Sequence, residues 1–376
     1  MATKVPTNKA AYLVGKRIRP LVVQAAPYTS PGPSEIVVKN QAVAVNPVDW
    51  FKQYVGNLLL SWIKYPFVLG GDLAGEIVEV GNDVTHFKVG DRVMGHAAGM
   101  DEKQNRSSEG AFQQYTVVRE NLAAPIPDAL PYKQACVLPL ALSTAATGLF
   151  QKDYLALEYP TVSSKPTGEA LLVWAGSTSV GSNAVQLATA AGYEVFTTAS
   201  PRNFAYVKRL GASQVFDYRS PTVIRDITLA LDRKFLAGAL AIGNNGAESC
   251  IAVLEEAKGR KFVALASFPT PETLPEGSGQ NMATLYLMLS VVWWQLSIWF
   301  KSRTTGIPTK FIIGDTLQYN EFSRVVYKDF LPRALAEGTY VVAPPPLLVG
   351  HGLEQIQKAF DIQKKGVSAQ KVVVTL

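Results

Sequence analysis

The sequence predicts an α/β protein with a β-rich N-terminal part and a later parallel sheet covered by helices. Two observations predict this class. Short alternating strands with Gly-Asp and Gly-Asn turns fill the first part, and a loop at 99–109 between them is polar enough to be exposed. After about residue 132 the pattern changes to buried-type strands that alternate with helices, which implies parallel strands joined by crossover helices.

The expected elements follow one another in a regular order. In the first part we expect strands at 35–45, 75–84 and 110–118, followed by a helix at 131–150. The alternating part then gives strands at 169–176, 193–200, 213–218, 235–243 and 261–267, with helices at 179–192 and 203–212. The last part gives helices at 320–338 and 353–366 and a closing strand at 371–376.

Composition limits the classes of function. The chain has 376 residues, of which 48% are hydrophobic and 18% charged, which suggests two domains with ample core. A net charge of +6 fits an anionic ligand or a generic basic surface, and the absence of a dense Lys/Arg cluster argues against nucleic acid. Two cysteines and no signal-peptide core at the N-terminus predict a reducing, cytoplasmic location.

One apolar segment, residues 283–300, has a length at the lower edge of what a membrane span needs. Gln and Ser residues interrupt it, and it lies between expected strands. We therefore expect a buried or interface helix that lines an apolar substrate pocket, with membrane-surface contact as the second interpretation and a true span as the third.

A glycine-containing turn follows the expected strand at 169–176. It consists of Gly176, Ser177, Thr178, Ser179, Val180 and Gly181. The turn differs from the dinucleotide fingerprint G-x-G-x-x-G at the middle place, where Thr178 replaces glycine. A pyrophosphate would suit a tight turn at Gly176, close helix packing at Gly181 and the N-terminus of a helix. The hydroxyls of Ser177, Thr178 and Ser179 would also bind its oxygens. The alternative is a Ser/Thr-rich helix cap without a ligand.

The end of the next strand indicates which dinucleotide fits. An NAD site places a carboxylate there for the ribose hydroxyls, but this sequence has Ser200, Arg202 and Asn203 instead. A guanidinium and neutral donors suit an adenosine 2′-phosphate, which a carboxylate repels. The sequence therefore favours NADP(H) over NAD(H). The alternative is that Arg202 is only a solvated residue at the start of a helix.

Several further motifs stand in order along nearly the whole chain. They are NPVDW (46–50), PFVLGGDLAGEIVEVG (66–81), VGDRVMG (89–95), EGAFQQYTVV (109–118), LPLALSTA (138–145) and VSAQKVVVTL at the C-terminus. Together with the glycine turn, they resemble the motifs of the medium-chain dehydrogenase/reductase superfamily. The resemblance implies a GroES-like β-rich catalytic domain formed by residues 1–140 and 315–376. It also implies an inserted Rossmann domain, a doubly wound parallel sheet that binds NADP(H), at 141–314.

The residues at the family's catalytic zinc positions differ from the ligands. Zinc alcohol dehydrogenases carry a histidine where this chain has Gly71 and a cysteine where it has Asn46. Glycine has no ligating side chain, and an amide is a poor zinc ligand beside thiolate and imidazole. The two cysteines cannot form the four-cysteine structural lobe either. We expect no metal, which places the chain with the zinc-free quinone and enoyl reductases.

Within that branch, residues 199–221 look like the fungal trans-acting enoyl reductases of the lovastatin type, which partner polyketide synthases. The resemblance implies that Ser177 to Val180 hold phosphates, that Ser200 to Asn203 hold the 2′-phosphate and that Tyr218 lies near the adenosine. Leu265, in the strand expected at 261–267, belongs to the same expected cofactor site. Thr144 is expected to line the cleft for nicotinamide and substrate.

Lys52 and Tyr54 follow NPVDW, where enoyl reductases of the superfamily place a proton donor or polar anchor. Tyr54 is the candidate donor to an enolate, and the alternative is that it packs with its hydroxyl on water. Asp49 is expected to be structural, holding the turn by hydrogen bonds.

We therefore predict NADPH-dependent reduction of a conjugated carbon–carbon double bond, of enoyl, enone or quinone type, in a small hydrophobic substrate. Addition of hydride to an alkene conjugated with a carbonyl does not require a metal electrophile. A zinc-free carbonyl or alcohol oxidoreductase and a non-catalytic NADPH-binding protein are the alternatives. A monomer or homodimer in fungal secondary metabolism, with a polyketide synthase as partner, is the expected setting.

Overall fold

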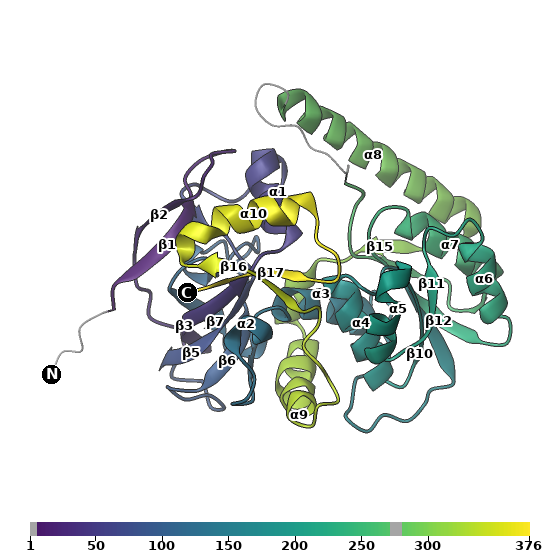
Figure 1. The fold of residues 1–376 in the computed structure, drawn as a ribbon, viewed down its shortest axis with the longest axis horizontal. Helices are drawn as coiled ribbons and strands as arrows, with labels where there is room; N and C mark the ends of the chain where they lie inside the picture. The colour runs from purple at the N-terminus through teal and green to yellow at the C-terminus, as the bar shows by residue number, and fades with distance from the viewer. Residues whose placement is uncertain (1–5, 271–279) are drawn as a thin grey trace. The chain divides into compact units, whose positions relative to one another are not determined.

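The computed structural model describes residues 6–270 and 280–376. The chain forms two compact units, the first from residues 1–140 and 318–376 and the second from residues 141–317. Figure 1 shows both, with most of the strands and helices labelled.

The sheets of unit 1 bring distant parts of the sequence together. Within the described residues, the larger sheet has the order β16-β17-β3-β5-β6-β8, with β7 on β3, and a small sheet has the order β2-β1-β4. The strands are β1 Asn8–Leu13, β2 Val22–Ala26, β3 Glu35–Ala44, β4 Phe67–Val68, β5 Asp72–Val80, β6 Arg92–His96, β7 Tyr115–Arg119, β8 Ala123–Pro125, β16 Pro346–His351 and β17 Lys371–Thr375. Because β17 pairs with β3, the C-terminal strand is part of the N-terminal sheet.

The helices of unit 1 follow local sequence signals. They are α1 Pro47–Val55, α2 Tyr132–Ala135, the π-helix η7 Arg324–Phe330, α9 Leu331–Ala336 and α10 Ile356–Lys365. The single helix expected at 131–150 is wrong, since α2 ends at Ala135 and a separate α3 spans Pro139–Phe150. Pro139 has no backbone N–H to continue a helix, and its fixed φ suits a first turn, so the break comes there.

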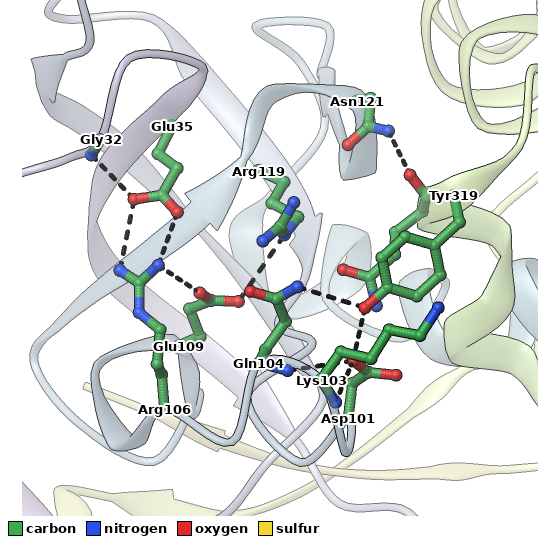
Figure 2. A network of polar contacts seen from close by, with 11 residues as sticks. Gly32, Glu35, Asp101, Lys103, Gln104, Arg106, Glu109, Arg119, Asn121 and Tyr319 are labelled. Atoms are coloured by element: carbon green, nitrogen blue, oxygen red, sulfur yellow. Dashed lines mark hydrogen bonds and ion pairs between the residues drawn. The ribbon is translucent and has the colours of Figure 1, made fainter.

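The polar loop at 99–109 is not simply exposed, which corrects the expectation. Figure 2 shows the polar network that holds it. Glu109 is buried, and Arg106 bridges its carboxylate at 2.9 Å and that of Glu35 at 2.8 Å. Burial raises the pKa of Glu109 above its ordinary value, with Arg106 and Arg119 opposing the rise. Tyr319 donates to Asp101 at 2.5 Å, which fixes the other end of the loop.

Unit 2 is a parallel sheet in the order β11-β10-β9-β12-β14-β15, with β13 beside β12. The strands are β9 Glu169–Val173, β10 Glu194–Ala199, β11 Ala212–Asp217, β12 Phe235–Ala241, β13 Lys258–Gly259, β14 Val263–Leu265 and β15 Thr309–Phe311. The helices are α4 Ser179–Ala190, α5 Phe204–Arg209, α6 Val223–Ala230, α7 Gly246–Glu256 and α8 Gln280–Thr305, together with most of α3. Strand order reverses between β9 and β12, and the carboxyl edge at such a switch point is where doubly wound sheets bind ligands.

The long helix α8 lies beside α7 (Figure 1) and contains the apolar segment 283–300. The prediction of a helix is confirmed. Of the two forms expected for it, the buried helix is wrong, and the interface helix stays a prediction. By length and composition Asn281–Thr305 is the one candidate membrane span among the described residues, and only 17% of its most apolar window is buried. Its inner face packs on the core of the unit through Trp294 and Ile298, and its outer face is exposed.

Candidate functional site

The glycine turn lies at the carboxyl end of β9, directly before α4. A Cβ on Gly176 would lie 2.2 Å from the hydroxyl oxygen of Thr197, and one on Gly181 would lie 2.3 Å from the carbonyl oxygen of Ala175. Both positions therefore need glycine because of close packing, as the fingerprint requires. Ala175 has a φ of +66°, an uncommon value for a residue with a side chain.

Thr178, which replaces the middle glycine, caps helix α4. Its hydroxyl accepts a hydrogen bond from the Gly181 N–H at 3.0 Å and donates one to the Ala175 carbonyl at 2.9 Å. The cap interpretation of this hydroxyl is thus the observed one. The other part of the predicted phosphate site is the N-terminus of α4, with the backbone of Ser179 and Val180 in its first turn. There the N–H groups and the helix dipole attract anions.

Two threonines of β10 fix the turn to the sheet. The Ala175 N–H donates to the Thr198 hydroxyl at 2.9 Å, and the Thr197 hydroxyl donates to the Val173 carbonyl at 2.6 Å. Both threonines are fully buried, so these bonds are shielded from water. The backbone of the turn is therefore held in one geometry, which sequence reasoning did not predict.

The predicted 2′-phosphate corner follows β10, the strand next to β9, so it lies at the same edge of the sheet. Ser200 is largely buried and accepts hydrogen bonds from Asn203, through the side-chain amide at 3.2 Å and through the backbone N–H to its carbonyl at 2.8 Å. Arg202 is exposed. The corner thus presents a guanidinium and neutral groups without a carboxylate of its own.

Tyr218 extends this edge from the neighbouring strand β11. It is 47% exposed, with the Arg219 guanidinium 5.5 Å from its ring centroid. Asp217, the carboxylate nearest to it in sequence, pairs with Arg219 at 3.5 Å, which offsets its charge. An exposed ring beside a guanidinium suits an adenosine that carries a phosphate.

The other predicted residues of unit 2 lie further along it. Leu265 ends β14, is buried, and accepts a backbone hydrogen bond from Ile312 at 2.8 Å. Thr144 is largely buried on α3 beside Gly314, where an added Cβ would lie 2.7 Å from the Thr144 hydroxyl oxygen.

The glycine turn, the 2′-phosphate corner and Tyr218 follow the neighbouring strands β9, β10 and β11, so they form one contiguous edge of the sheet. Its donor groups fit a phosphorylated dinucleotide.

In unit 1, Lys52 is fully buried on α1. Its ammonium donates to the carbonyl oxygens of Gly56, Leu59 and Leu60 at 3.2, 2.8 and 3.0 Å, and burial lowers its pKa to about 8. These contacts stabilise the end of α1. Tyr54 is also buried, with the Lys364 ammonium 4.5 Å from its ring centroid. Residues two apart on a helix do not face each other, so Lys52 and Tyr54 point to different surroundings, and their catalytic roles stay predictions.

A second polar cluster of unit 1 surrounds Asp72 at the start of β5. Asp72 is fully buried, and its carboxylate lies 2.8 Å from the Lys371 ammonium. It also accepts hydrogen bonds from the Asn46 side-chain amide at 2.8 Å and from the Leu140 N–H at 2.6 Å. Lys371 in turn donates to the Asn46 side-chain oxygen. Asp49 accepts from the Asn46 N–H at 2.7 Å, so its structural role is confirmed.

These residues do not fit a catalytic zinc ion. By the resemblance, Asn46 and Gly71 stand where zinc-dependent relatives carry ligands, and the ammonium of Lys371 already supplies the cation that neutralises Asp72. A Cβ on Gly71 would lie 2.5 Å from the Leu140 side chain, so no larger ligand side chain fits there without movement of Leu140. Sequence reasoning missed Lys371. The available signal was a lysine at the first position of an otherwise apolar strand.

Comparison with known proteins agrees with this fold. Residues 32–128 match the family model described as an alcohol dehydrogenase GroES-like domain. The chain is 53% identical to "Dehydrogenase pigH" of Monascus ruber, over 99% of this chain and 100% of that protein. It is 38% identical to "Trans-enoyl reductase himH" of Aspergillus japonicus, over 98% of this chain and 97% of that protein.

A solved structure shows the same fold. The alcohol dehydrogenase superfamily protein of Novosphingobium aromaticivorans superposes with a TM-score of 0.72 at 23% identity, over 98% of this chain and 100% of that one. The predicted fold class, a GroES-like domain with a Rossmann-type parallel sheet, is therefore confirmed.

Proposed function

Because the chain is an oxidoreductase of the medium-chain dehydrogenase/reductase superfamily, we propose that it reduces a conjugated carbon–carbon double bond with NADPH and without zinc. The substrate class is a hydrophobic enone, enoyl compound or quinone. The name of the relative himH, a trans-enoyl reductase, supports an enoyl substrate. We also propose a role in fungal secondary metabolism, with a polyketide synthase as the partner that carries the substrate. The proposed location is cytoplasmic.

The observation that carries the proposal is the cluster of Asn46, Asp72 and Lys371. A ketone needs a strong electrophile at its oxygen, which zinc supplies in metal-dependent relatives. The cluster has an ammonium and an amide instead of zinc. The Lys371 ammonium is already paired with the Asp72 carboxylate, and the Asn46 amide already donates a hydrogen bond to it. An alkene conjugated to a carbonyl accepts hydride at its β-carbon, and the negative charge spreads onto the oxygen. Its reduction therefore needs a weaker electrophile at that oxygen than the reduction of a ketone does.

The bound nicotinamide supplies the hydride. The protein's contribution in this proposal is to bind and orient. The first turn of α4 holds the pyrophosphate through its N–H groups, and Ser200 and Arg202 hold the 2′-phosphate. The buried threonines of β10 keep the turn rigid, so that the cofactor is positioned rather than only bound. Tyr54 remains the candidate proton donor to the enolate.

The direct test incubates the purified chain with NADPH and a panel of enones, quinones and aldehydes, and follows the absorbance of the reduced cofactor. With NADPH deuterated at the transferred position, we expect each enone to give the saturated ketone with deuterium at the β-carbon and a solvent proton at the α-carbon. Turnover of aldehydes alone would replace the proposal with carbonyl reduction. Tight NADPH binding with no turnover of any acceptor would replace it with a non-catalytic cofactor-binding protein.

A second experiment tests cofactor choice separately. A hydrogen bond to a charged group contributes about 1.5–3 kcal/mol, so Arg202→Ala should raise the KM for NADPH by roughly ten- to a hundredfold. The KM for NADH should stay within about twofold, since NADH has no 2′-phosphate for the guanidinium to bind. Arg209→Ala, which removes an exposed arginine at the end of α5, is the matched control. Equal effects on both cofactors would contradict the 2′-phosphate assignment.

A further inference from the structure

The outer face of α8 is a surface of large apolar side chains. The ten side chains of this face are between 41% and 74% exposed, and they are Met282, Leu285, Tyr286, Met288, Leu289, Val292, Trp293, Leu296, Trp299 and Phe300. We call these ten residues the α8 face. The sequence from Asn281 to Phe300 contains no charged residue.

The helix that presents this face is anchored to unit 2. Leu287 and Ile298 are buried on its inner side, and the Trp294 indole N–H donates to the Glu248 carboxylate on α7 at 2.9 Å. Trp294 and Ile298 pack on the hydrophobic core of the sheet. The inner side of α8 therefore packs within the chain's own fold, and the α8 face is not needed to hold the helix in place.

The area of the α8 face is that of a protein interface. Aromatic side chains bury about 150–250 Å² each, so ten large side chains at these exposures present on the order of 1,000 Å². The largest apolar patch of a typical monomer is about 300–600 Å², and each partner of a stable complex buries about 800 Å². The face therefore exceeds what a monomer normally exposes and reaches what a stable dimer needs.

The spacing of the residues indicates a helix as the opposing surface. Met282, Leu285, Leu289, Val292, Leu296 and Trp299 recur at alternating intervals of three and four residues. This is the repeat of positions that interlock between two paired helices. A second line, Tyr286, Trp293 and Phe300, recurs every seven residues beside it and widens the contact.

We propose that the α8 face is the interface of a homodimer in which α8 packs against α8 of a second copy of this chain. A twofold interface must be complementary to itself, and a face without charges brings no like charges together. A lipid surface is less suitable, since helices that lie on membranes have polar faces rich in Lys and Arg. Here the first cations, Lys301 and Arg303, come only after the apolar stretch ends.

The test measures the mass of the full chain by light scattering coupled to size-exclusion chromatography, across micromolar concentrations. We expect twice the mass of one chain for the wild type. Leu289→Glu/Trp293→Glu places charges in the centre of the face and should raise the dimer dissociation constant by at least about thirtyfold. Leu229→Glu, on an equally exposed leucine of α6, should leave the dimer intact. Circular dichroism checks that both variants keep the wild-type helix content.

A crosslink tests the geometry without charges. Leu289→Cys/Val292→Cys should form a disulfide-linked dimer on oxidation, since position 289 meets 292 of an antiparallel partner or 289 of a parallel one. The natural cysteines Cys136 and Cys250 are buried and free, so they do not compete. A chain that stays monomeric and uncrosslinked overturns the proposal. A monomer that also floats with phosphatidylserine-containing vesicles would assign the α8 face to lipid instead.

Discussion

Replacement of Lys371 by methionine tests the buried cluster of unit 1 most directly. Lys371 is 3% exposed and Asp72 0% exposed, so Lys371→Met leaves a carboxylate without its cation in a site shielded from water. Loss of one partner from a buried ion pair costs about 3–5 kcal/mol. In a unit of about 200 residues each kcal/mol lowers Tm by roughly 2–4 °C, so we expect a fall in Tm of about 6–20 °C.

Thermal unfolding followed by circular dichroism gives the Tm of the full chain, and urea unfolding followed by tryptophan fluorescence gives its free energy of unfolding. Lys88→Met is the matched control, because Lys88 is exposed and pairs with Asp91 at 2.9 Å on the surface. An exposed pair contributes about 0–1 kcal/mol. Asp72→Asn in the Lys371→Met background removes the unpaired charge and should recover at least about 1 kcal/mol.

Two results would refute the reasoning. If Lys371→Met is no less stable than Lys88→Met, the pair does not neutralise a buried charge. If the double variant is no more stable than Lys371→Met alone, the loss comes from packing of the lysine stem and not from the carboxylate.

Two further predictions concern Asp49 and the glycine turn. Burial raises the pKa of Asp49 from 3.8 to about 7. The folded state therefore holds its proton more tightly, and stability should fall as pH rises from about 4 to 7, by up to about 4 kcal/mol. Asp49→Asn keeps an acceptor for the Asn46 N–H and should flatten that part of the stability profile, as measured by urea unfolding at a series of pH values; an unchanged profile would contradict the raised pKa. Gly176→Ala forces a Cβ against the Thr197 hydroxyl and should cost about 1–3 kcal/mol and weaken NADPH binding. The cost should be smaller in a Thr197→Ala background, and equal costs in the two backgrounds would show that the clash is elsewhere.

Much of the fold could be predicted from periodicity, because unit 2 is built from local patterns. The buried-type strands β9, β10 and β12 begin within a residue of their predicted positions. The strand expected at 110–118 begins only at Tyr115. The carbonyl groups of Gly110 and Ala111, which come before it, accept hydrogen bonds from side chains. The Gln113 amide donates to the Gly110 carbonyl at 2.7 Å, and the Asn40 amide donates to the Ala111 carbonyl at 3.1 Å.

The parts of the candidate site that could not be predicted depend on partners distant in sequence. From the sequence, Thr178 suits both a phosphate ligand and a cap of α4. Only the positions of Ala175 and Gly181 show that its hydroxyl is already hydrogen-bonded within the turn. Lys52 is similar, because no pattern in its own helix indicates that three carbonyl groups of the following turn surround it. A side chain's chemistry can be read from sequence, but its hydrogen-bond partners depend on tertiary structure.

The pairing of β17 with β3 has a consequence for how the chain is made. Residues 141–317 are continuous, so unit 2 has all its strands once they have left the ribosome. Unit 1 lacks β17, and with it the counter-charge for Asp72, until residue 371 has been translated. The N-terminal part of unit 1 therefore becomes stable only after unit 2 can fold, and during that interval its unpaired sheet edges are open to pairing with other chains.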